Sequence, residues 1–413
     1  SFMLGCWWLL VVGCWWLVAG FPATDHFMRV AHPLLRAKKT GFGFLVRKPS
    51  GNLRVVMHCF SRTLLPVLLS SALSLLFPET IPASCFKPTL HRNQMPPAAI
   101  LLELPPDSAC VLEHGEPAVR LSWQGSNTTV LFKNKGERSA RYLIDHERWE
   151  QTVQAQLGLG TGFDLGVIGR YTDEGSGRWD PFMRSFHEVL GLPYNSRRIR
   201  PNGEYRYWQC NPSDPSIGCT SDDVNEGRVL DLYASQRGWG DWIVMLKYAL
   251  PMRDSRTHWA GRLVWKEPSR TDLPTISSGA RDFGAGVMVE GAGTFWDCPT
   301  DWLVNLGGVA PGATKHQAYP QHKTFLSGTL GFSRSCEEPW AWLGQFQFAS
   351  PRYRTPYPPV QAIGTAQFIL MLGFEYRTTP SRWRFGFTED TIYNTSEDFS
   401  LLLEWVWEPS DTQ

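Results

Sequence analysis

The sequence predicts an all-β protein: a single antiparallel transmembrane β-barrel of about twelve strands, with a long helix-containing loop and an N-terminal leader outside the barrel. Three observations support this class. Apolar residues alternate at period two, aromatic residues gather at the ends of the alternating segments, and the connections are short and long in turn. Alternation gives a strand one apolar and one polar face, and aromatic girdles are typical of the two interfaces of a membrane barrel.

Alternation is clearest near the end of the chain, where a mixed file separates the apolar residues Gly364, Ala366, Phe368, Leu370, Leu372, Phe374 and Tyr376. Similar patterns recur from residue 117 onward. The predicted strands are 117–132, 147–159, 162–171, 239–250, 257–266, 282–296, 302–309, 323–333, 340–349, 364–377, 381–389 and 398–407. The even number is expected for a bacterial single-chain barrel.

The lengths of the predicted connections alternate. The even connections, from Gly160–Thr161 to Thr378–Pro380, are all shorter than the odd ones, which are 133–146, 172–238, 267–281, 310–322, 350–363 and 390–397. A barrel with its N-terminus in the periplasm has short turns there and longer loops outside. A secreted β-sandwich has no reason to keep this rhythm, so the lengths favour the barrel.

Composition excludes several classes of function. The 40 Lys and Arg residues nearly balance the 39 Asp and Glu residues, for a net charge of +1, so no nucleic-acid partner is expected. Nine cysteines include no C-x-x-C pair, so we expect no metal site and no cofactor. The mean hydropathy of −0.24 suits a membrane barrel, because only alternate residues meet lipid.

The first 85 residues contain two apolar runs. Residues 2–21 carry no charge and are long enough for a membrane-spanning helix. Residues 64–77 follow the basic His58 and Arg62, as in a signal peptide. We predict that translation starts at Met57 and that residues 57–85 are the signal. Residues 1–56 are then an upstream segment without a globular fold, or else a membrane anchor.

The remaining chain divides into three parts. Residues 86–116 are rich in proline and have no period, which predicts a periplasmic lead-in or a small plug. Residues 117–407 form the outer-membrane barrel, and residues 408–413 are a tail. Within the 172–238 connection, Asp180 and Pro181 predict the start of a helix. This helix is expected either to fold into the lumen or to pack across the outer mouth.

Several short motifs occur in a fixed order along the chain. They are Arg92-Asn-Gln94 before Pro96, Phe186-His187 with Gly191-Leu-Pro193, Gly240-Asp241 with Lys247-Tyr248, Ser277-Ser-Gly279 with Asp282, and Phe387-Thr-Glu-Asp390 with Asp398-Phe399. Through them the chain resembles a family of predicted bacterial outer-membrane β-barrels that is known only as a domain of unknown function. The resemblance covers residues 91–407, apart from Lys266-Glu-Pro268, which here continues into Ser269-Arg270 rather than Thr-Gly. It implies a fold and a compartment but no activity or catalytic residue.

Alternation also predicts a set of charged residues on the inner face. They either form a paired network that stiffens the barrel or line a polar pore. A second basic cluster in the 172–238 connection is either a solvated loop or a contact for lipopolysaccharide phosphates. The inner residues are Asp164, Arg170, Asp241, Lys247, Arg262, Glu375, Arg382 and Arg384, and the loop cluster is Arg197, Arg198, Arg200 and Arg206.

The catalytic candidate is His187, with Glu188 beside it and Asp180 or Ser185 nearby. No recognisable catalytic motif surrounds it, so a packing or hydrogen-bonding role is favoured. Two disulfides are predicted from position, Cys210 with Cys219 in the long connection and Cys298 with Cys336 on one rim.

The predicted function is an outer-membrane channel or porin-like protein for small solutes, with the 172–238 connection as a constriction or lid. The alternatives are a lipid-modifying hydrolase that uses His187 and a non-conducting structural or surface-interaction barrel. The expected partners are outer-membrane lipid, lipopolysaccharide and the barrel assembly machinery, which is expected to bind the C-terminal strand from Phe399 to Trp407.

Overall fold

The structure, a computed structural model, describes residues 85–133, 140–190, 201–210, 228–251, 257–270, 272–295, 297–314, 319–355, 361–391 and 395–408. The upstream segment 1–56, most of the predicted signal and nearly all of the tail lie outside these ranges, so they stay predictions. No helix among the described residues is long and apolar enough to cross a membrane.

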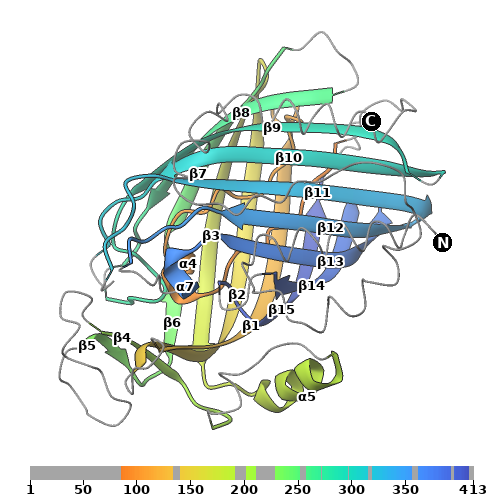
Figure 1. Cartoon of the computed structure of the whole chain (residues 1–413). Helices are drawn as coiled ribbons and strands as arrows, with labels where there is room; N and C mark the ends of the chain where they lie inside the picture. The colour runs from red at the N-terminus through yellow and green to blue at the C-terminus, as the bar shows by residue number, and fades with distance from the viewer. Residues whose placement is uncertain are drawn as a thin grey trace, which may run out of the picture. The chain divides into compact units, whose positions relative to one another are not determined.

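Twelve antiparallel strands form a closed ring, which confirms the predicted fold class (Figure 1). The first and last strands close it, from Val119 opposite Trp407 to Asn127 opposite Phe399. Closure leaves no unpaired strand edge in the ring. The strands are β1 (Pro117–Lys133), β2 (Ala140–Gly160), β3 (Phe163–Gly175), β7 (Trp242–Ala249), β8 (Thr257–Glu267), β9 (Asp282–Phe295), β10 (Cys298–Ala310), β11 (Phe325–Glu337), β12 (Trp340–Ala349), β13 (Gln367–Thr378), β14 (Ser381–Asp390) and β15 (Phe399–Trp407).

The two faces of the ring have the polarity of a membrane barrel. Outward side chains are apolar and exposed, as with Leu263 at 61% and Trp342 at 67% exposure. Inward side chains on the same strands are polar or charged and buried, and they include Arg120, Glu150, Lys247 and Arg384. A soluble barrel shows the reverse arrangement, so the outer surface is the one that meets lipid.

The ring has a short-turn rim and a long-loop rim. The turns 161–162, 250–256, 296–297, 338–339 and 379–380 form the first, and the connections 134–139, 176–241, 268–281, 311–324, 350–366 and 391–398 form the second. One expectation about length is wrong: 134–139 is shorter than 250–256. The reason is that β2 begins at Ala140 rather than at residue 147, because β1 and β2 pair beyond the band that faces lipid.

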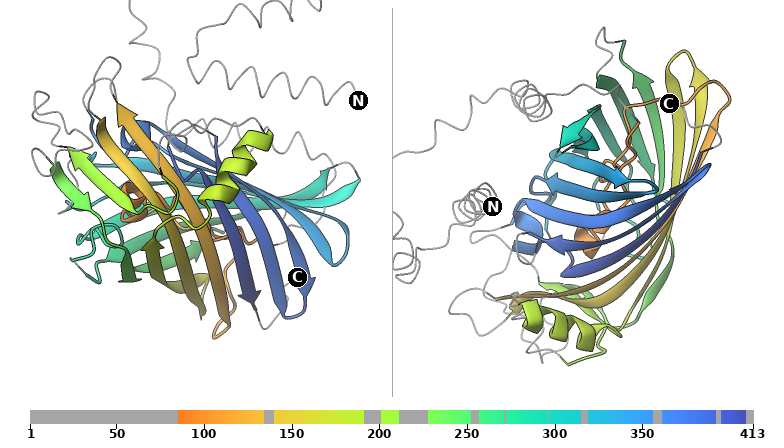
Figure 2. Two further views of the ribbon diagram at one scale, coloured as in Figure 1. Left: turned by 90° about the horizontal axis from the view of Figure 1, so that it is seen from below. Right: turned by 90° about the vertical axis from the view of Figure 1, so that its right-hand side faces the viewer.

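The long connection 176–241 contains α5 (Asp180–Leu190), β4 (Arg206–Cys210), β5 (Arg228–Leu232) and β6 (Gln236–Trp239). Strand β4 pairs with the start of β2, β5 pairs with β4, and β6 pairs with the end of β3. The predicted strand 239–250 is therefore divided between β6 and β7. Helix α5 lies against the outside of the ring, so both positions predicted for it are wrong (Figure 2).

Candidate functional site

Residues 85–116, called the plug below, run through the lumen from the short-turn rim to the long-loop rim and back (Figure 2, orange trace). Their turning point is the short helix α4 (Pro96–Ala99), where the Tyr353 hydroxyl of a long loop donates a 2.7 Å hydrogen bond to the Pro97 carbonyl. Residues 86–109 are buried throughout. The segment for which the sequence predicted a lead-in or a plug thus fills the barrel.

The plug has little secondary structure, so its backbone groups need partners in the wall. Inward carboxylates supply several acceptors. Glu404 accepts a 2.8 Å hydrogen bond from the Leu90 N–H, and Asp282 accepts one of 2.8 Å from the Leu102 N–H. Inward amides and cations serve the carbonyl groups: Gln347 donates to His91 at 2.8 Å. The charged inner wall therefore replaces water around an irregular chain.

Ion pairs add a second set of contacts between plug and wall. Arg92 of the plug binds Glu150 of β2 through both Nε and Nη2. Glu150 is also 3.2 Å from Arg148 and 3.6 Å from Arg170, so it has two cations in the wall as well. A buried ion pair is stable only when each charge has enough partners to replace the water it has lost. The pair of Arg92 and Glu150 meets this condition, because Glu150 is in contact with three cations.

Lys266 of β8 is the centre of a cluster of contacts, called the clamp below, that holds the plug just after its turning point at α4. Its ammonium lies 3.0 Å from Asp241 and 2.9 Å from Asp282, and it donates to the Ile100 carbonyl at 2.7 Å and to the Ser278 hydroxyl at 2.6 Å. Two of the motifs that carried the family resemblance meet here, Gly240-Asp241 and Ser277-Ser-Gly279 with Asp282. The residues at which the sequence departs from the family, Ser269-Arg270, border this clamp, since the Ser269 N–H donates to Asp241 at 3.2 Å.

The predicted inner residues all lie on the inner side of the ring or at its mouth. Seven are buried, while Arg382 is half-buried at the short-turn rim. Most are paired. The pairs are Asp164 with Lys247, Asp107 of the plug with Lys247, Asp241 with Lys266, Arg170 with Glu150, and Glu375 and Glu404 with Arg384, while Arg262 donates to the Pro105 carbonyl of the plug.

The long-loop rim is sealed by apolar packing around the plug tip. Leu101 and Leu102 belong to a buried cluster with Tyr207 of β4 and with Tyr319 and Tyr353 of two long loops. Glu397 of the 391–398 loop borders this seal and accepts a 2.9 Å hydrogen bond from the Gln94 N–H. Burial raises the pKa of Glu397 to about 7.

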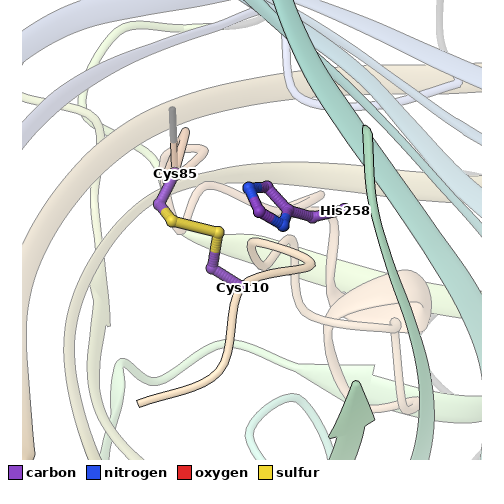
Figure 3. A group of neighbouring side chains, drawn as sticks. All are labelled: Cys85, Cys110 and His258. Carbon is purple, nitrogen blue, oxygen red and sulfur yellow. A yellow bond between two sulfur atoms is a disulfide. The ribbon is translucent and has the colours of Figure 1, made fainter. Parts of the chain in front are cut away.

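The short-turn rim is open to a cavity of about 640 Å³ below the plug. Cys85 and Cys110 line it and are joined by a disulfide that closes the plug on itself rather than onto the wall. Their sulfur atoms and the imidazole of His258 lie within 4.8 Å of one another (Figure 3). Because the sulfur atoms are bonded to each other, they are not the thiolates that bind metals.

The other predicted residues are distributed as follows. His187 is buried on α5, outside the ring, with Nδ1 2.8 Å from the Met183 carbonyl. Arg206 pairs with Asp231 at 3.1 Å, whereas Arg197, Arg198 and Arg200 lie outside the described residues. Cys298 and Cys336 form a disulfide at the short-turn rim, and Cys219 lies outside the described residues.

Sequence reasoning missed the residues that contact the plug most directly. Glu150, Glu404, Gln347 and Asn305 all hold plug residues. The signal was present for Glu150 and Gln347, which lie in polar files of predicted strands, whereas Asn305 and Glu404 share their files with apolar residues such as Leu303 and Val406. Alternation identifies which residues of a strand face the lumen, but it does not show which part of the chain those residues contact.

The fold and the lumen define the class of this protein: a twelve-stranded transmembrane β-barrel whose lumen is occupied by its own N-terminal segment. The chain belongs to the family described as "Protein of unknown function (DUF3187)", whose model matches residues 64–406. No curated protein matches the chain.

The chain is similar over most of its length to several solved structures. An outer membrane channel from Pseudomonas putida F1 is 9% identical over 74% of this chain and 100% of its own, with a TM-score of 0.47. A Pseudomonas aeruginosa FadL homologue is 8% identical over 71% and 91%, with a TM-score of 0.33. The translocator domain of the autotransporter NalP from Neisseria meningitidis is 8% identical over 72% and 89%, also with a TM-score of 0.33.

Proposed function

We propose that this protein is an outer-membrane channel for small hydrophilic solutes, and that the plug closes it at rest. The observation that carries the proposal is the chemistry of the contact between plug and wall. Throughout the lumen the plug is held by hydrogen bonds and ion pairs to side chains that water can solvate once the plug moves. A plug held by apolar packing alone would have to expose that apolar surface to water in order to move.

The inner wall also suggests the kind of solute. Acidic and basic residues alternate around it, as with Glu375 and Arg384 or Asp164 and Lys247. A pore lined by both positive and negative side chains selects little by charge. We therefore expect the solutes to be small polar molecules, whether anionic, cationic or uncharged. The cavity at the short-turn rim has room for such a molecule below the plug.

Orientation follows from the rims. Short turns face the periplasm in bacterial barrels, which places the disulfide end of the plug there and the apolar seal outside. Opening then needs two events: the loops around Tyr319 and Tyr353 must leave the tip, and the plug must move out of the lumen.

Conductance in planar bilayers tests the proposal. Arg92→Ala removes one anchor of the plug, and Glu150 keeps Arg148 and Arg170 as cationic partners in the wall. We expect the wild-type protein to open rarely and Arg92→Ala to open several-fold more often, with little preference between cations and anions. Arg281→Ala is the matched control, because Arg281 forms an exposed pair with Glu267 on a long loop.

The refuting result is also clear. If both wild type and Arg92→Ala are folded, as judged by heat-modifiable gel mobility, and neither conducts or admits sugars in a liposome-swelling assay, the plug is a permanent filling. The protein would then be a non-conducting barrel.

A further inference from the structure

Helix α5 is attached to the outward face of the ring at the closing seam between β1 and β15. Its first residue, Asp180, accepts a 2.9 Å hydrogen bond from the amide of Asn127 on β1. The preceding Trp179 donates its N–H to Glu147 of β2 at 2.9 Å. Both wall residues belong to outward files, so the N-terminus of the helix is fixed to the outside of the barrel.

The exposure of Phe399 shows that the helix covers the wall. Phe399 begins β15 and points outward, in the same file as Leu401, which is 45% exposed. Phe399 itself is only 4% exposed, and the ring of Phe182 lies 6.1 Å from it. An outward aromatic residue that should meet lipid is thus covered by α5.

Aromatic contacts set the height of the helix. Trp179 packs edge-on against Trp149 of β2 at 4.8 Å. Trp149 is one of a band of outward aromatic residues near the long-loop end of the strands, where a membrane barrel has its interfacial girdle. The band includes Trp149, Tyr171, Trp239, Trp242, Trp265, Phe283, Phe348, Phe368, Phe387 and Phe399.

One flank of α5 is apolar and exposed. Phe182, whose ring also packs against Phe399, is 53% exposed, and Val189, two helical turns further along the same stripe, is 83% exposed. Glu188 is exposed on another side of the helix, about 100° around the axis from Val189, whereas the buried Met183 and His187 face the protein. An exposed apolar stripe at the height of the girdle is in the plane where headgroups meet acyl chains.

We propose that α5 is an interfacial helix that lies in the plane of the outer leaflet and places Phe182 and Val189 at the boundary between lipid headgroups and acyl chains. The helix is thereby a lipid-binding surface beside the barrel rather than a lid over its mouth. The occupant is lipid because the stripe is continuous with the girdle and with the exposed apolar wall below it. This proposal requires that the barrel spans a membrane, but it does not require that the barrel conducts. A negative result in the conductance experiment would therefore leave it unchanged.

Depth-dependent quenching tests this with the full chain in liposomes. An environment-sensitive fluorescent amino acid is encoded at position 189 on the stripe in one variant and at position 188 off the stripe in another, both exposed positions of the same helix. Phospholipids brominated near the headgroup end of the acyl chain report contact with lipid, and aqueous iodide reports contact with water. We expect position 189 to be quenched at least about twofold more by the brominated lipid than position 188, with the opposite order for iodide.

Two results would overturn the proposal. Equal quenching at the two positions would place the helix in water above the membrane. Protection of position 189 from both quenchers, together with cross-linked dimers, would show that a second copy of the chain covers the stripe. Heat-modifiable mobility of both variants establishes that the barrel is folded in each measurement.

Discussion

Replacing Lys266 by methionine tests whether the clamp stabilises the barrel. Methionine has a similar length but no charge, so the substitution keeps most of the volume and removes one ammonium group from between Asp241 and Asp282. It also removes the donors to the Ile100 carbonyl and the Ser278 hydroxyl. Two buried carboxylates then share a site without their cation.

The magnitude follows from the contacts that remain. Removing one partner of a buried ion pair costs about 3–5 kcal/mol. Asp241 keeps the Ser277 hydroxyl and the Ser278 N–H as donors, and Asp282 keeps the N–H groups of Leu102 and Gly312. These donors place the expected loss near the lower end, about 3 kcal/mol, which is roughly a hundredfold in the unfolding equilibrium constant.

Urea-induced unfolding in lipid vesicles, followed by heat-modifiable gel mobility, measures the loss. Arg281→Ala is the control, since its pair with Glu267 is exposed and should leave the urea midpoint unchanged. The double variant Lys266→Met with Asp241→Asn should recover part of the loss, because one of the two stranded charges is gone. A midpoint for Lys266→Met equal to that of Arg281→Ala would refute the reasoning.

Two further predictions concern pH and wall packing. Burial raises the pKa of Glu397 to about 7 in the folded protein, whereas the ordinary value is 4.5. As pH rises, the Glu397 carboxyl group therefore loses its proton in the unfolded chain before it does so in the folded one. The free energy of unfolding should therefore fall as pH rises from about 4.5 to about 7, and Glu397→Gln should flatten this decline in urea titrations at several pH values. Gly307→Ala should destabilise by about 1–3 kcal/mol, because its new methyl group would collide with the Ala285 carbonyl and with Leu104 of the plug. Gly261→Ala has open space around it and should leave the urea midpoint nearly unchanged; equal effects of the two substitutions would contradict the packing described here.

The twelve ring strands were predictable because lipid and lumen impose opposite polarity on their two faces. The prediction failed where that contrast ends. Residues 140–146 of β2 extend beyond the lipid-facing band, and there the adjacent Leu143 and Ile144 are both buried, so no alternation marks the strand. The same reason explains why β4 and β5 were not predicted as strands.

The path of the plug was not predictable from local pattern. Its residues have no period, and each is defined by a partner far away in the chain, such as Glu404 for Leu90 or Asp282 for Leu102. The inner charges were identified from alternation alone, yet alternation does not distinguish a water-filled pore from a wall that binds a plug. The position of α5 depends on an outward Asn127 and Phe399, which look like ordinary lipid-facing positions in the sequence.

The closing pair of strands has a consequence for assembly. Glu404, on the last strand, contacts both Leu90 of the plug and Arg120 of the first strand. These two partners are synthesised early, and the residue that joins them is synthesised near the end. The Leu90 N–H gains this acceptor only when the last strand is in place, so closure of the ring also completes the site that holds the N-terminal segment. Contacts between residues this far apart in the chain are slow to form, because a long loop must close before they are made.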